Sequence, residues 1–215
     1  MATTGGPASS EMPPNFNPNI QYENLPKLPS LAKSHGIIMG LVFIVIMPLG
    51  SVLIRSSRNK NTVWFHAACQ LVGWVMMFGG LATGIKMAKI IDRLHNNAHT
   101  VLGTVVIAGL ILQPIFGSIH HRKFKSNQTH TIWTHIHVWY GRVLILLGII
   151  NGGLGLQLAR SSPAYSKPGL IVYSVLAGLV GLALLGLFFW VGKSKRHHGS
   201  DKAVTEGSNR ATAPA

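Results

Sequence analysis

The sequence predicts an all-α integral membrane bundle of five transmembrane helices. Five long apolar runs carry no charged residue, and only 11% of the 215 residues are charged. The mean hydropathy is positive, at +0.33. The net charge of +14 would suit a nucleic-acid-binding protein, but the basic residues cluster at the ends of the apolar runs. Such clustering is typical of membrane topology signals, so we expect membrane lipid and no nucleic acid as partner.

The five runs cover residues 36–54, 61–85, 100–119, 143–159 and 168–192. Each is near the roughly 20 residues that cross a bilayer as a helix, and the short fourth run extends back to about Trp133. A helix satisfies every backbone polar group locally, as lipid requires. Short connections make neighbouring helices antiparallel. The domain organisation expected is a disordered polar tail over 1–33, a membrane domain over 34–192 and a disordered basic tail over 193–215.

The positive charges predict the orientation of the bundle. Nine Lys and Arg residues near the membrane fall on the side of the first loop, the third loop and the C-terminal tail, and seven fall on the other side. The positive-inside rule therefore favours an N-terminus outside and a cytosolic C-terminus.

Histidines stand at one end of four successive runs. His35, His66 and His99 open the first three, and His135 and His137 both open the fourth. Antiparallel order puts His35 and His99 at the outer level, and His66 at the inner level with His137 or His135. Two facing imidazoles fit the axial positions of a haem iron. A single zinc ion is excluded, because the two levels lie roughly 20 Å apart by helical rise.

Spacing separates His137 from its neighbour His135. Haem needs room between helices, and His137 has Gly141 four residues later, as His99 has Gly103. His135 has the bulky Trp139 in that position, so we expect His137 to be the inner ligand.

Three cations lie near the predicted sites. Arg142 and Arg55 are on the inner side, and Lys86 is on the outer side. An intramembrane arginine indicates a functional role, here contact with a haem propionate or an anionic substrate. Snorkelling of Arg142 and plain topology charges at Arg55 and Lys86 are the alternatives.

Embedded polar residues and loop histidines add weaker signals. Gln70, Gln113 and Asn151 predict interhelical hydrogen bonds or contacts to the ligating imidazoles. His120, His121 and His130 fall in a basic inner loop, where a solvated face is favoured over binding of an anion or lipid.

The chain resembles the cytochrome b561 family, in the branch often linked to DOMON domains. The stretches that carry the resemblance are "HGIIMGLVFIVIMPLGSVLIR", "WFHAACQLVGWVMMFGGLATG", "HTVLGTVVIAGLILQPIFG" and "HIHVWYGRVLILLGIINGGLGL". It implies a four-helix core with a fifth helix added, and two b-type haems, one held by His35 and His99 and one by His66 and His137. We expect no DOMON module in this chain, because only a short polar tail precedes the first helix.

The resemblance also implies a function. A transmembrane oxidoreductase of this kind carries electrons from cytosolic ascorbate, or a similar reductant, to monodehydroascorbate or ferric chelates outside. Two alternatives stay open: an electron exchanger for a separate secreted redox protein, and a non-redox membrane scaffold or transporter. A homodimer is compatible with the sequence.

Asp92 is the only acidic residue between the tails, so no carboxylate proton relay is expected.

Overall fold

The computed structural model describes residues 17–186 apart from 57–58, 60, 128–130, 161 and 163–164. The C-terminal tail expected over 193–215, residues 1–16 of the N-terminal tail, and His130 lie outside the described residues.

Five helical segments are long and apolar enough to cross a membrane, which confirms the predicted fold class. The described part of the chain contains no strand. The first span, Tyr22–Ser56, begins with a short 3₁₀ helix, η1 (Tyr22–Lys27). It continues through α1 (Leu28–Gly40), η2 (Leu41–Ile46) and α2 (Met47–Ser56). The next three spans are α3 (Thr62–Ile90), α4 (Ala98–Asn127) and α5 (Ile132–Ala159), and the fifth spanning helix is Lys167–Gly186.

Several helices extend beyond the apolar runs of the sequence. The first begins at Leu28 rather than near residue 34, and α4 continues to Asn127 rather than ending near residue 119. His120 and His121 are therefore helical and not in a loop. An apolar run measures the hydrocarbon thickness, whereas a helix can continue into the polar interface.

A π-helical turn, η2, interrupts the first span. It ends two residues before Pro48, whose missing N–H leaves the carbonyl of Ile44 without its usual helical donor. The N–H of Met47 instead bonds to the carbonyl of Val42, five residues earlier. The turn therefore places one extra residue between the two ends of the first span.

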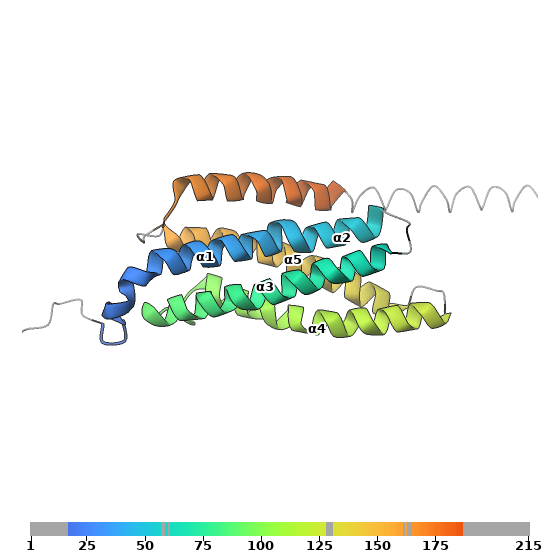
Figure 1. Cartoon of the computed structure of the whole chain (residues 1–215), viewed down its shortest axis with the longest axis horizontal. Helices are drawn as coiled ribbons and strands as arrows, with labels where there is room; N and C mark the ends of the chain where they lie inside the picture. The colour runs from blue at the N-terminus through green and yellow to red at the C-terminus, as the bar shows by residue number, and fades with distance from the viewer. Residues whose placement is uncertain are drawn as a thin grey trace, which may run out of the picture.

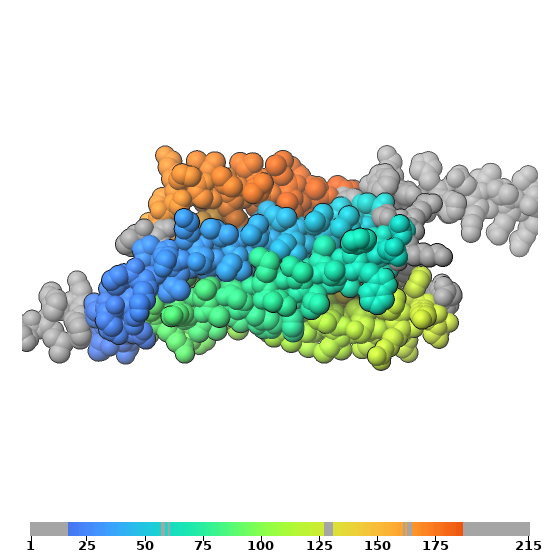
Figure 2. Space-filling view, viewed as in Figure 1, coloured from blue at the N-terminus to red at the C-terminus, as the bar shows by residue number. Residues whose placement is uncertain are grey.

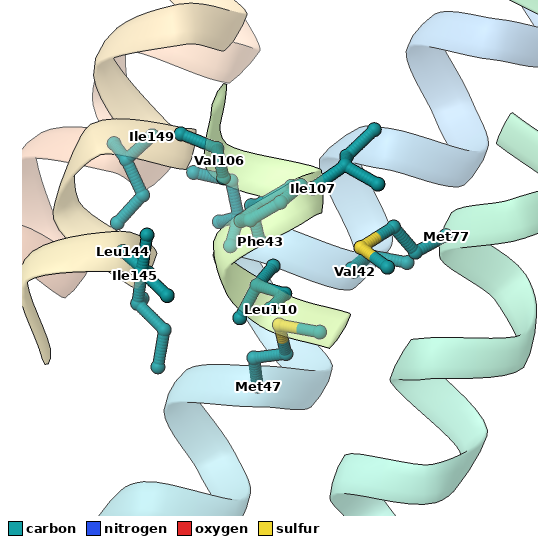
Figure 3. Packing of buried hydrophobic residues seen from close by; sticks show 11 residues of the cluster. Val42, Phe43, Met47, Met77, Val106, Ile107, Leu110, Leu144, Ile145 and Ile149 are labelled. Atoms are coloured by element: carbon teal, nitrogen blue, oxygen red, sulfur yellow. The ribbon is translucent and has the colours of Figure 1, made fainter. Parts of the chain in front are cut away.

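The four core helices form two hairpins. The first span packs against α3, and α4 packs against α5 (Figure 1). Between the hairpins, α1 and η2 contact α5. Eleven buried side chains form one cluster that joins the hairpins (Figure 3). They are Val42, Phe43, Ile44, Met47, Met77, Val106, Ile107, Leu110, Leu144, Ile145 and Ile149.

The fifth spanning helix lies on the outside of the bundle, along one edge of the molecule (Figure 2). Its apolar window has no buried residue, and Leu182 is 68% exposed. The Tyr173 hydroxyl, which donates to the carbonyl of Ile149 on α5 at 2.5 Å, connects this helix to the bundle. Exposed large apolar side chains also cover the other helices, as a lipid-facing surface requires.

Candidate metal-binding histidine pairs

The structure brings four histidines together in two facing pairs. The rings of His35 and His99 have centroids 5.9 Å apart, with planes at 89°. Those of His66 and His137 are 6.3 Å apart, with planes at 88°. His35 and His66 belong to one hairpin and His99 and His137 to the other, so each pair reaches across the gap between the hairpins.

The ring separations fit two imidazoles bound to opposite sides of one metal. A metal–imidazole bond is about 2.0–2.1 Å long, as known for zinc. A ring nitrogen lies about 1.1 Å from the centroid of a five-membered ring with bonds near 1.33 Å. Two metal–imidazole arms in line sum to about 6.3 Å. The observed distances of 5.9 and 6.3 Å are close to this value.

Hydrogen bonds select which nitrogen of three histidines faces the gap. The Nδ1 atoms of His35 and His66 lie 2.8 Å from the carbonyl oxygens of Gly80 and Gly50, and Nδ1 of His99 lies 3.0 Å from that of Asn151. A carbonyl oxygen only accepts, so each Nδ1 must carry the hydrogen. Each Nε2 then has its lone pair free to bind a metal.

His137 differs from the other three. Its Nδ1 atom is buried and has no hydrogen-bond partner among the described residues. Its ring stacks on His120, with centroids 6.0 Å apart and planes at 17°. His120 is in turn held by Thr134, whose Oγ1 lies 2.9 Å from the His120 Nδ1 atom.

Glycines on neighbouring helices make room for the imidazoles. A Cβ atom at Gly84 or at Gly155 would lie 2.8 Å from the ring of His35 or His99, and one at Gly117 would lie 3.1 Å from the ring of His137. Gly103 and Gly141, expected to leave room for a haem, are not the glycines that adjoin these rings.

Gly103 and Gly141 face the side-chain amides of Asn151 and Gln113 instead. A helical side chain points away from its own helix axis toward a neighbour. The space that a histidine ring needs is therefore on the neighbouring helix, not one turn along its own helix.

The buried cluster separates the two pairs. On α4 it occupies Val106–Leu110, past His99, and on α5 it occupies Leu144–Ile149, past His137 (Figure 3). Within the part of the chain that the structure describes, no group of three or more His, Cys, Asp or Glu side chains converges on a common point. The arrangement therefore offers two separate two-histidine sites.

Two arginines from different hairpins approach each other. Arg142 on α5 is half-buried, and its guanidinium carbon lies 5.5 Å from the ring centroid of Trp139. Arg55, exposed at the end of α2, is close enough to Arg142 for like-charge repulsion. Such a pair of cations attracts an anion. Lys86 is exposed on α3, two residues after Gly84.

Two other histidines near the inner pair lie in different environments. His135 is exposed on α5, and the ring that faces His66 is that of His137. His120, interpreted as part of a solvated loop, lies against His137. Extending the helical pattern of Gly103, Leu110 and Gly117 by one turn would have placed His120 on the inner face.

The predicted role of the embedded amides is confirmed for both glutamines. The Nε2 atom of Gln70 donates to the Met47 carbonyl at 3.0 Å, and that of Gln113 donates to the His137 carbonyl at 3.4 Å. Both bonds connect neighbouring helices of one hairpin.

Comparison with known proteins supports the family resemblance. No known family profile matches the chain, and no solved structure matches it either. The chain is 25% identical over 191 residues to the cytochrome b561 and DOMON domain-containing protein At4g17280 of Arabidopsis thaliana, covering 83% of this chain and 44% of that protein. The protein At2g04850 of the same description and organism is 25% identical over 160 residues, covering 72% and 39%.

A third Arabidopsis protein of this description, At3g61750, is 27% identical over 129 residues, covering 58% of this chain and 31% of that protein. The chain thus spans less than half the length of each of these curated relatives. The five-helix membrane protein described above is accordingly a relative of the cytochrome b561 and DOMON domain-containing proteins.

Proposed function

We propose that this protein carries electrons across a membrane through two b-type haems, one held by His35 and His99 and the other by His66 and His137. The observation that carries the proposal is the pair of facing imidazole sets, at 5.9 and 6.3 Å, on opposite sides of one buried cluster. A relationship to proteins named for cytochrome b561 agrees with this chemistry.

When bound, haem supplies one-electron chemistry at its iron, and the protein supplies ligation, orientation and electrostatics. The Nε2 atoms of the four histidines would hold the two irons. The carbonyls of Gly80, Gly50 and Asn151 fix three of the rings through Nδ1 and raise the basicity of Nε2.

The buried cluster excludes water between the two sites. Its side chains are apolar, and Val42 and Met77 have no exposed surface at all. Water and ions gain no polar partner in such a layer. The layer would therefore keep ions from crossing the membrane along the path that electrons use.

The arginine pair would serve an anionic group at the inner site. Arg142 and Arg55 together suit a haem propionate or the anionic reductant ascorbate. Lys86, exposed on α3, would play the corresponding part at the outer end. With the N-terminus outside, the donor is cytosolic ascorbate or a similar reductant, and the outside acceptor is monodehydroascorbate or a ferric chelate.

Haem stoichiometry tests the ligand assignment. Full-length protein, expressed with ample haem supply and purified, is expected to contain two haems per chain. His99→Ala and His137→Ala should each remove one haem, and His135→Ala should keep both as the matched control. A colourless wild-type protein would eliminate the redox proposal and favour a non-redox scaffold or transporter.

Reconstituted vesicles test the direction of electron flow. Ascorbate is trapped inside, ferric chelate is added outside, and reduction of the chelate is followed with time. Reduction without any other protein supports the proposed activity. A strict need for an added redox protein overturns direct chelate reduction and favours an electron exchanger that serves that partner.

A further inference from the structure

The two hairpins repeat the same arrangement of hydrogen bonds. In the first, the carbonyl that binds His35 belongs to Gly80, fourteen residues after His66. In the second, the carbonyl that binds His99 belongs to Asn151, fourteen residues after His137. In both, a glycine four residues further along faces the bound ring. Position 66 thus corresponds to 137, and position 35 to 99.

The π-helical turn explains why the spacing along the first helix of each hairpin differs by one residue. The carbonyl that binds His66 belongs to Gly50, fifteen residues after His35. Since η2 adds one residue to the first span and α4 has no such turn, the equivalent position is fourteen residues after His99, at Gln113. The Gln113 backbone does interact with His137, although the His137 Nδ1 atom makes no hydrogen bond to any described residue.

At the level of the inner histidine pair, each hairpin has one glutamine and one facing glycine. The glutamine is on the second helix of the first hairpin but on the first helix of the second hairpin. The first hairpin has Gly50 on the first span and Gln70 on α3, four residues after His66. The second has Gln113 on α4 and Gly141 on α5, four residues after His137. Each glutamine occupies the space over the facing glycine, where an added Cβ would lie 2.6 Å from Gln70 Nε2 or 3.0 Å from Gln113 Nε2.

Each glutamine also bonds to the backbone of the facing helix. Gln70 bonds to the carbonyl of Met47, three residues before Gly50, and so ties α3 to the turn that holds His66. Gln113 bonds to the carbonyl of His137 itself, and its own carbonyl is turned toward the His137 ring. Gln113 therefore ties α4 to the helical turn that carries His137.

We propose that Gln70 and Gln113 are equivalent positioning residues of the inner site, with one supplied by each hairpin. Gln70 sets the carbonyl that orients His66, and Gln113 orients His137 directly. This inference rests on the proposed function, because it assumes that the inner pair holds a haem. Outer partners of metal-bound histidines typically alter affinity or activity by roughly ten- to a hundredfold.

Interchanging the glutamine and the glycine of the second hairpin provides the decisive experiment. Gln113→Gly removes the amide, and Gly141→Gln crowds the space that it fills. Combining the two rebuilds in the second hairpin the arrangement native to the first. The introduced amide can then bond to the carbonyl of Leu110, which Pro114 has deprived of its helical donor. Gln113→Leu keeps the bulk without the amide, and Gln157→Gly, exposed on α5, controls for the cost of glycine in a helix.

The readouts are the haem content, the midpoint potential of each haem and the electron paramagnetic resonance (EPR) signal of each ferric haem. His99→Ala and His137→Ala identify which signal belongs to which site. Both single variants and Gln113→Leu should weaken retention of the inner haem about tenfold or more, or shift its potential and EPR signal. The outer haem should be unchanged, and the double exchange should restore the wild-type inner signals.

An unchanged inner signal in Gln113→Gly and Gln113→Leu, in protein with both haems, would overturn the inference and leave the proposed function intact. A double exchange that fails to recover the inner signals would also overturn it, by removing the equivalence of the two glutamines. Equal loss of both haems in Gln113→Leu would show a merely structural role. Wild-type protein without haem would instead refute the proposed function.

Discussion

The ring of His66 on α3 faces that of His137 on α5 at 6.3 Å, with the two planes nearly perpendicular at 88°. The two residues come from different hairpins, so the inner site exists only when the hairpins are assembled. The same is true of His35 and His99 at the outer end.

The perpendicular ring planes predict a spectroscopic signature. Crossed axial imidazoles leave two iron d orbitals nearly equal in energy, which makes the low-spin ferric signal strongly anisotropic. EPR of the oxidised protein should therefore show such signals from both haems, since the planes cross at 89° and 88°. Signals typical of parallel imidazoles would contradict the ring orientations.

Filling a glycine beside an outer histidine should displace its ring. Gly84→Ala places a methyl group within 3 Å of the His35 ring, and such overpacking costs about 1–3 kcal/mol. The outer haem should be bound less completely, or its midpoint potential should shift, while the inner haem is retained. Gly79→Ala on the same helix meets nothing within 4 Å and serves as the control. Equal behaviour of the two variants would refute the role of Gly84.

Removing the positive charge of Arg142 should lower the potential of the inner haem. A nearby cation favours the reduced site, which carries one less positive charge, so Arg142→Gln makes reduction harder. Arg142→Lys keeps the charge but loses the planar fork that binds an anionic group at two points. Redox titration should show a larger shift for the glutamine variant, and an unaltered potential in both would exclude contact with the site.

Kinetics with ascorbate separate the two roles open to Arg142. If the arginine binds ascorbate, Arg142→Lys should raise the KM for ascorbate while leaving the potential near that of the wild type. A KM equal to that of the wild type would assign the arginine to haem alone.

Loosening the fifth helix should cost stability without loss of haem. Tyr173→Phe removes the hydroxyl that bonds to the Ile149 carbonyl, and interhelical bonds in membranes contribute roughly 0.6–1.7 kcal/mol. Thermal unfolding should occur at lower temperature, with two haems still bound, because no described residue of this helix is a histidine. Val172→Ala, at an exposed position of the same helix, is the control.

The orientation of the protein in the membrane can be measured with introduced cysteines, because the chain has a single native cysteine to remove. Cys69→Ser gives a background without thiols, to which His121→Cys or Asn96→Cys adds one at either end of α4. With the C-terminus in the cytosol, an impermeant thiol reagent added to intact cells should label position 96 and spare position 121. The reverse pattern would invert the proposed direction of electron flow.

The sequence by itself determined the spanning helices and the level of each histidine. Lipid leaves a helix as the only solution for a long apolar run, and short connections force an up-and-down order. These constraints are local, so composition and spacing were sufficient to place His35 level with His99, and His66 level with His135 or His137.

Only the tertiary structure decided which groups surround each ring. Gly84, Gly117 and Gly155 belong to neighbouring helices, and the extra residue of η2 sets how the two hairpins correspond. Rotation of one helix against another depends on packing between segments far apart in the chain, which spacing along a single helix does not encode. His120 next to His137, and the exchange of glutamine and glycine between the hairpins, became evident for this reason only once the helices were packed together.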